Sequence, residues 1–118
     1  MTAPVWLAFL VAAGAGAVAR YAVDRRLSTP RGTLAVNVSG SFVLGVVTGL
    51  VLYHGVSSDV RFVAGTGFCG AFTTFSTFAL EALLMAQDRR RGRPGRYVVV
   101  SVVGGLGAAA VGLLLASA

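Results

Sequence analysis

The sequence is poor in charge, contains no lysine and has a single cysteine. Only 12% of its 118 residues are charged and 56% are hydrophobic, a composition too apolar for a soluble domain of this length. The lone Cys69 excludes an internal disulfide and a cysteine-based metal cluster. A nucleotide-binding motif, paired carboxylates and a proton relay are also missing, so the sequence indicates neither an enzyme nor an active pump.

What the sequence has instead is four long apolar stretches, at about residues 4–23, 34–53, 60–85 and 98–115. A helix needs roughly 20 mostly apolar residues to cross a bilayer. We therefore predict an all-α membrane protein, with a single four-helix domain over residues 1–118, in the cell (plasma) membrane. The first stretch lacks the basic start and the polar cleavage zone of a secretory signal, so we expect it to be retained.

All ten basic residues are arginines, against four acidic residues. In a soluble protein such an excess would suggest nucleic acid. Here we expect no nucleic acid partner, because most arginines lie in loops, where they contact membrane lipid headgroups and fix orientation. The connections after the first and third stretches carry eight of them, and the side with both termini and the middle connection has only Arg61, at the start of the third stretch. Since arginines favour the cytoplasmic side, we predict insertion in one orientation, with both termini outside.

Hydroxyl side chains gather in the third apolar stretch, where Thr73, Thr74, Ser76 and Thr77 follow Gly70. Glycine, threonine and serine are weak helix formers, so this segment predicts a break in the helix near the middle of the membrane. A break frees backbone carbonyls, which suit a cation where protein or a water-filled cavity covers them. The alternative, that hydroxyls bond back to their own helix, is favoured only for isolated threonines elsewhere in the spans.

Phe75 and Phe78 stand three residues apart within this segment, so they share one face if the helix resumes. The edge of an aromatic ring carries positive partial charge, and it can face a small anion without supplying a full charge that would trap the ion. Asn37 and Ser41 share a face of the second stretch in the same way. Plain packing is the alternative interpretation of the two rings.

Three segments, in this order along the chain, resemble signature segments of the Fluc/CrcB family of fluoride channels: GAVARY at residues 16–21, PRGTLAVNVSGSF at 30–42 and GFCGAFTTFSTF at 67–78. The resemblance covers nearly the whole chain. It implies an antiparallel dimer of four-helix subunits with two narrow pores, through which fluoride leaves the cytoplasm passively so that its toxicity falls.

The resemblance also implies roles for individual residues. The backbone carbonyls of Gly70 and Thr73 would hold a structural sodium ion at the dimer interface, and Arg20 would lie near a vestibule that attracts anions. The fluoride pathway would be lined by Phe75, Phe78, Asn37, Ser76, Thr77 and Ser101. Ser101 is the only hydroxyl inside the fourth stretch, with Gly105 one turn further on. Related channels can offer a further serine at the place of Gly105, so this difference bears on whether both pores of a dimer are fully lined.

Alternatives stay open for assembly and for function. An antiparallel dimer of chains that insert in one orientation needs a homologous second chain of opposite charge bias, and a homodimer of dual topology is the alternative. The rival function is a small four-helix, dual-topology cation or drug exporter, which requires a titratable group within the membrane. Glu81, near the end of the third stretch, is the only acidic candidate. A third interpretation is a non-transporting assembly subunit with glycine-rich helices.

Overall fold

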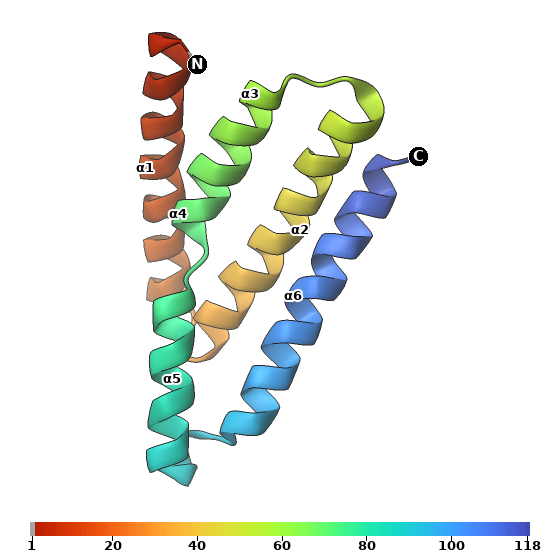
Figure 1. The fold of residues 1–118 in the computed structure, drawn as a ribbon. Helices are drawn as coiled ribbons and strands as arrows, with labels where there is room; N and C mark the ends of the chain where they lie inside the picture. Colours follow the sequence, from red (N-terminus) through yellow and green to blue (C-terminus); the bar gives the residue numbers. More distant parts are fainter. Residues whose placement is uncertain (1) are drawn as a thin grey trace.

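The computed structural model describes residues 2–118, and its regular structure in that range is helical. Four helical spans are long and apolar enough to cross a membrane (Figure 1). They are α1 (Ala3–Arg26), α2 (Arg31–His54), the third span (Ser58–Gln87) and α6 (Pro94–Ala116). The four predicted spans are therefore confirmed, and each helix extends a few residues beyond the predicted ends.

The third span is divided into short helical segments with a break between the last two. Thr73, with φ −85° and ψ 164°, and Thr74, with φ −149° and ψ 120°, are both extended. The helical segments are α3 (Ser58–Val60), the π-helical η1 (Arg61–Cys69), α4 (Gly70–Phe72) and α5 (Phe75–Gln87). The break predicted from the hydroxyl-rich segment is therefore present, between α4 and α5.

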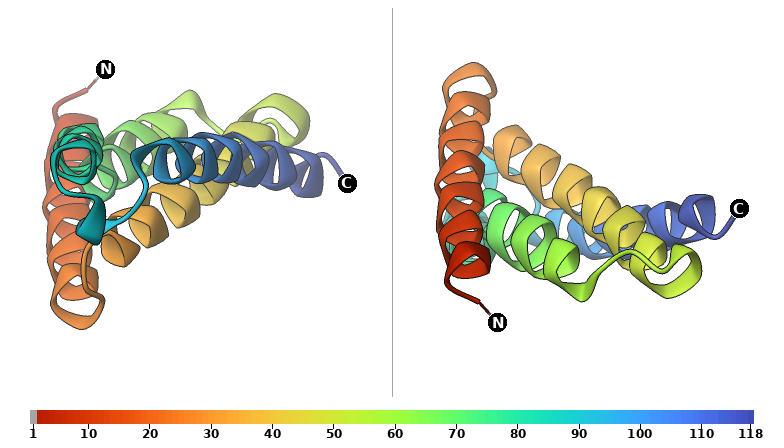
Figure 2. Two further views of the ribbon diagram at one scale, coloured as in Figure 1. Left: turned by 90° about the horizontal axis from the view of Figure 1, so that it is seen from below. Right: turned by 90° about the horizontal axis from the view of Figure 1, so that it is seen from above.

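Helices α2 and α6 run side by side in the same direction (Figures 1 and 2). Their backbones touch at glycines. A Cβ atom on Gly45 would lie 2.2 Å from the Ala109 carbonyl oxygen, and one on Gly49 would lie 3.1 Å from the Leu113 carbonyl oxygen. Small residues allow the close approach that drives helix association in lipid, where the hydrophobic effect does not.

Helix α1 packs on the first half of the third span in the same close way. A Cβ atom on Gly16 would lie 2.3 Å from the Phe68 carbonyl oxygen. Nearer the N-terminus, the rings of Phe9 and Phe62 stack with their centroids 4.5 Å apart, and Trp6 meets Phe62 edge-on at 5.3 Å. The chain therefore forms two helix pairs, α1 with η1 and α4, and α2 with α6 (Figure 2).

Both ends of the chain and the α2–α3 connection lie at one end of the molecule, and the α1–α2 and α5–α6 connections lie toward the other (Figure 1). The arginines in and beside these two connections are thus toward the same side, as the sequence predicts. Little of the apolar surface is covered within the chain: only 6% of the most apolar stretch of α1, and likewise of α6, is buried. Surface of this kind faces lipid or another chain.

Candidate functional site

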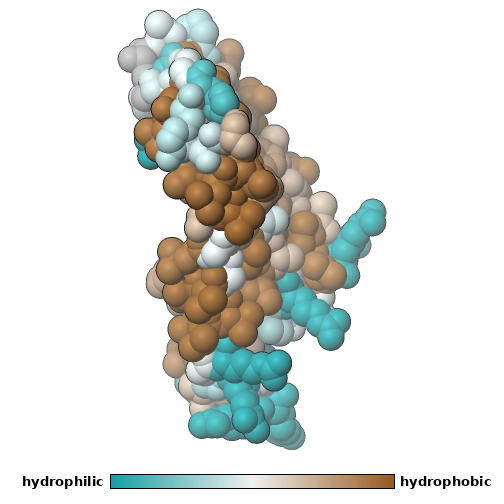
Figure 3. Space-filling model, turned by 90° about the vertical axis from the view of Figure 1, so that its right-hand side faces the viewer, coloured by the Kyte–Doolittle hydropathy of each residue, from teal (hydrophilic) through white to brown (hydrophobic). Residues whose placement is uncertain are grey.

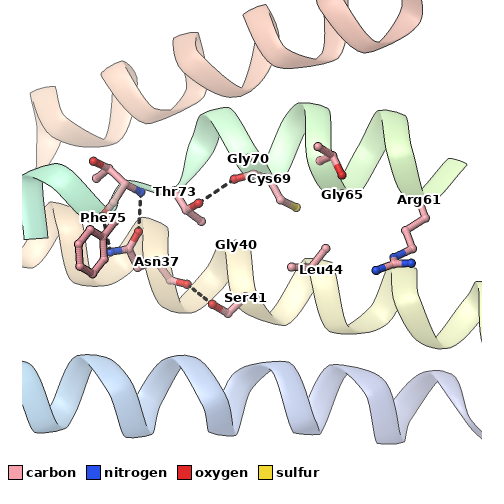
Figure 4. A pocket seen from close by; sticks show the side chains of 12 residues that line it. Asn37, Gly40, Ser41, Leu44, Arg61, Gly65, Cys69, Gly70, Thr73 and Phe75 are labelled. Atoms are coloured by element: carbon pink, nitrogen blue, oxygen red, sulfur yellow. Dashed lines mark hydrogen bonds between the residues drawn. The ribbon is translucent and has the colours of Figure 1, made fainter. Parts of the chain in front are cut away.

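The helix break is held against α2 by the side chain of Asn37 (Figure 4). Asn37 Nδ2 donates to the Thr74 carbonyl oxygen at 3.0 Å, and the Thr74 N–H donates to Asn37 Oδ1 at 2.8 Å. These bonds replace the backbone pairing that an extended residue loses inside a membrane, where an unpaired polar group costs several kcal/mol. An amide nitrogen carries two protons, so Asn37 keeps one for a further acceptor.

Gly40 lets the break approach α2 closely. A Cβ atom on Gly40 would lie 2.4 Å from the Thr73 Cγ2 methyl group and 3.3 Å from the Phe72 ring. The N–H and the Oγ1 of Thr73 both donate to the Cys69 carbonyl oxygen, at 3.0 and 2.9 Å. The Thr73 hydroxyl therefore donates to the end of the helix that precedes it. The group of Thr73 that could bind an ion is its backbone carbonyl.

Two carbonyls at the break lose the amide partners that a continuous helix would give them. In an α-helix the carbonyls of Gly70 and Thr73 would accept from the N–H groups of Thr74 and Thr77. The Thr74 N–H donates instead to Asn37 Oδ1 at 2.8 Å, and the Thr77 N–H donates to Thr74 Oγ1 at 3.2 Å. The two carbonyls predicted to hold sodium are therefore carbonyls whose helical N–H partners bond to side chains instead. Carbonyl oxygens released in this way at a helix break fit that cation.

A groove of about 480 Å³ runs along α2 beside the break and the first half of the third span (Figure 4). Its walls are formed in part by Gly70 and Thr73, whose carbonyls are the predicted sodium ligands, and by Asn37, Ser41 and Phe75. Arg61 lies at the far end of the groove from Phe75. The groove therefore brings together the predicted sodium ligands, the Asn37 amide and the first of the two predicted pore rings.

The start of α5 carries four of the predicted pathway residues. Phe75 is 79% exposed and its ring centroid lies 5.8 Å from that of Phe78, with a 52° angle between the ring planes. Thr74 Oγ1 donates to Thr77 Oγ1 at 3.1 Å and lies 3.4 Å from Ser76 Oγ. The two rings therefore share a face, as predicted, beside a connected group of hydroxyls.

Ser101 and Arg20 come from the other two helices, α6 and α1. The Ser101 hydroxyl oxygen is buried and has no hydrogen-bond partner within the described part of the chain. Gly105 faces Ser41 across the α2–α6 contact, so Ser101, one turn earlier on the parallel helix, lies at the level of Asn37. Arg20 is half-buried on α1 and is not among the residues that line the groove.

Sequence reasoning missed a buried polar cluster around Glu81. Thr33 Oγ1 donates to Glu81 Oε1, and Tyr97 Oη donates to Glu81 Oε2 at 3.2 Å. Thr33 is only 1% exposed and Glu81 only 9%, so the cluster joins α2, α5 and α6 inside the molecule. An acid within an apolar span needs partners, and this rule could have prompted a search for them, but it does not identify residues so distant in sequence.

Comparisons with known proteins place the chain in a family. A family model described as CrcB-like protein, Camphor Resistance (CrcB), matches residues 7–113. The chain is 47% identical to the Fluoride-specific ion channel FluC 1 of Leifsonia xyli subsp. xyli, over 98% of this chain and 88% of that protein. It is 40% identical to the Fluoride-specific ion channel FluC 2 of Mycobacterium tuberculosis, over 98% and 94% of the two chains. The same identity, over 91% and 93%, relates it to the FluC 2 of Cutibacterium acnes. With its four spanning helices, this chain is a multi-pass membrane protein and belongs to the CrcB family.

Proposed function

We propose that this chain is a subunit of a passive, fluoride-selective channel that exports fluoride from the cytoplasm and so lowers its toxicity. Its family membership and the names of its relatives, Fluoride-specific ion channel FluC 1 and FluC 2, support the proposal. The structural observation that carries it is the break clamped by Asn37, which lies beside the Phe75 and Phe78 rings. The same names point to transport rather than catalysis.

A passive pathway is sufficient for export. Hydrogen fluoride is a weak acid that crosses lipid as the neutral molecule and dissociates in the less acidic cytoplasm, which traps the anion. The inside-negative membrane potential then favours exit of each anion by about 2.3 kcal/mol per 100 mV. A selective pore therefore needs no coupled energy source.

The inferred pathway is lined by ring edges and neutral hydrogen-bond donors from three helices: Phe75, Phe78, Ser76 and Thr77 of α5, Asn37 of α2 and Ser101 of α6. The Ser101 hydroxyl and the second Nδ2 proton of Asn37 can replace water that fluoride loses. Neutral donors and ring edges bind weakly enough for the ion to leave again. Arg20 on α1 would attract anions toward a vestibule.

The carbonyls of Gly70 and Thr73 are the inferred ligands of a structural sodium ion, which is not transported. The diversion of their helical partners supports this assignment. The ion would balance the partial negative charge of the free carbonyls and hold two subunits together at their breaks. A dimer structure determined in sodium buffer should contain a cation between the two breaks, and carbonyls turned away from each other without such a cation would remove the site.

The inferred assembly is an antiparallel dimer with a homologous second chain. The support is the placement of eight arginines in or within a few residues of the α1–α2 and α5–α6 connections, against Arg61 near the other end, which favours a single orientation. A chain that cannot invert needs a companion of opposite bias for antiparallel pairing. A dual-topology homodimer is the alternative, and fluoride conduction by the purified chain alone would support it.

The function is tested by flux from liposomes that contain the purified chain, with and without a co-expressed homologous chain. Rapid efflux of fluoride with little efflux of chloride or of an organic cation is the expected result. The rival exporter would instead move organic cations in exchange for protons through Glu81. The relatives' names do not favour that rival, and equal efflux of chloride and fluoride would contradict the proposed selectivity.

A further inference from the structure

A second groove, separate from the groove at the break, lies between α2 and α6. Its volume is about 630 Å³. Its walls are mainly hydrophobic: Leu34, Ala35, Val38, Phe42, Val100 and Ala108. Arg31, the first residue of α2, is the charged residue that lines it. The groove therefore joins an apolar floor to a basic group at one helix end.

Further arginines extend this basic end. An adjoining cavity of about 400 Å³ is lined by Arg91, Arg93 and Arg96, and it shares Leu34 and Val100 with the groove. The two hollows therefore adjoin each other. Arg31, Arg91, Arg93 and Arg96 are called the arginine rim below.

The charge of the arginine rim is not neutralised by the nearby acids. The one ion pair within the described residues joins Arg90 to Asp88, at 3.3 Å, and involves no member of the rim. Two further acids lie close to this end. The Asp24 carboxylate would lie 3.2 Å from a Cβ atom on Gly32, next to Arg31, but it forms no ion pair with a member of the rim. Glu81 accepts hydrogen bonds from Thr33 and Tyr97. Four like charges on two adjoining hollows favour an anionic group near them.

The length of the groove fits one leaflet of a bilayer. Its α2 residues run from Arg31 to Phe42, which at 1.5 Å per residue is about 16 Å. The hydrocarbon core of a bilayer is about 30 Å thick, so the groove extends over about half of it. An apolar groove of this depth below a basic rim matches an acyl chain below a negatively charged headgroup.

We propose that the α2–α6 groove binds one anionic phospholipid, with an acyl chain along the groove and the phosphate at the arginine rim. Figure 3 shows hydrophobic side chains over the middle of the α6 side and hydrophilic ones gathered at its lower end. The arginine count puts that end on the cytoplasmic side, where anionic lipids create a negative surface potential. The site lies apart from the break and does not depend on the fluoride pathway.

Native mass spectrometry of the full-length protein, purified in detergent, tests the site. Phosphatidylglycerol and phosphatidylcholine with identical acyl chains are added at equal concentration. We expect phosphatidylglycerol to be retained preferentially. The double variant Arg31→Gln/Arg96→Gln should weaken its binding by roughly tenfold or more, because each basic side chain at a membrane surface contributes about fivefold. The matched double variant Arg25→Gln/Arg26→Gln removes the same amount of charge near the α1–α2 connection, from two residues that do not line the groove. It should bind phosphatidylglycerol as the unchanged protein does.

A third variant, Ala108→Phe, separates the groove from its rim. It keeps all four arginines and fills the apolar floor, so it should also lose phosphatidylglycerol. Equal retention of the two lipids, equal losses in the two arginine variants, or unchanged binding by a folded Ala108→Phe protein would overturn the proposal. If the unchanged protein retains both lipids equally and Ala108→Phe abolishes its dimers, the proposal is also overturned, and the groove is then a contact with a second copy of the chain. If Ala108→Phe does not fold, as judged by helicity and size-exclusion chromatography, the two arginine variants decide.

Discussion

Asn37 of α2 and Thr74 of the third span form a pair of hydrogen bonds, at 2.8 and 3.0 Å, in which each residue both donates and accepts. The side-chain amide of Asn37 therefore supplies the hydrogen bonds that the backbone of Thr74 would otherwise make within a helix. The position of the break depends on this contact between two helices, and not only on the weak helix propensity of the hydroxyl-rich segment.

Replacing Asn37 should weaken the fold and the pathway together. Asn37→Ala leaves the Thr74 N–H and carbonyl without partners, at about 1–3 kcal/mol for each buried group, and we expect a lower melting temperature and slower fluoride efflux. Ser39→Ala is the control, because the Ser39 hydroxyl is exposed and bonds the Ala35 carbonyl of its own helix. An Asn37→Ala protein as stable as the control variant would show that the clamp contributes nothing.

The two rings should act through their edges and not only through their bulk. Phe75→Ile and Phe78→Ile preserve much of the volume and remove the aromatic charge distribution, so each should slow fluoride efflux by roughly tenfold, equivalent to about 1.4 kcal/mol. Phe9→Ile, in the α1 stack with Phe62, should leave the efflux rate unchanged. Normal efflux through both folded α5 variants would make the ring assignment wrong.

Bulk at the α2–α6 contact should separate the helix pair. Gly45→Val places a side chain where even a Cβ atom would lie 2.2 Å from the Ala109 carbonyl oxygen, so we expect a loss of at least about 1–3 kcal/mol of stability. Gly107→Val is the matched control on α6, since a Cβ atom there would meet nothing within 4 Å. Thermal unfolding in detergent measures both, and equal melting temperatures would contradict the close contact.

The Glu81 cluster should tolerate an amide but not a deletion. Glu81→Gln retains an oxygen acceptor and adds a donor, and hydroxyls can serve as donor or acceptor, so the contacts with Thr33 and Tyr97 can be rebuilt. Glu81→Ala leaves both hydroxyls without the partner that each now has, and its unfolding free energy should fall below that of Glu81→Gln by about 1–3 kcal/mol. Equal stability of the two variants would argue against a structural role for the carboxylate.

Orientation can be measured by cysteine labelling in intact cells. The native Cys69 is only 3% exposed, so a single added cysteine supplies the signal. Gly95→Cys, next to the arginine-rich connection, should react only from the cytoplasm, and Ser57→Cys, in the α2–α3 connection, should react only from outside. Comparable labelling of Gly95→Cys from both faces would show dual topology and favour the homodimer.

Composition and spacing were enough to predict the four spans and the break. Bilayer thickness sets the length of each apolar stretch, and Gly70, Thr73 and Thr74 are weak helix formers within five residues. Local physics therefore predicts both features, although the contact with Asn37 helps to fix where the break lies. The shared face of Phe75 and Phe78 also follows from local geometry, because α5 resumes directly at Phe75.

Contacts between distant segments could not be read in the same way. The sequence marks Asn37 as a polar residue in a span, but only packing shows that it bonds the backbone of Thr74. Thr33 and Tyr97 look like ordinary residues near the ends of their stretches until α2, α5 and α6 bring them to Glu81. The alignment of one helix along another determines which residues meet, and a hydropathy pattern does not predict this alignment.

The break in the third span also turns two helix ends toward one point. The peptide dipoles of η1 and α4 end there with partial negative charge, and those of α5 begin there with partial positive charge. Carbonyls at the first end favour a cation, and the N–H groups of Phe75 and Ser76 at the second favour an anion. One interruption of a helix can therefore offer ligands of both signs side by side, using only partial charges and keeping ionised side chains out of the middle of the membrane.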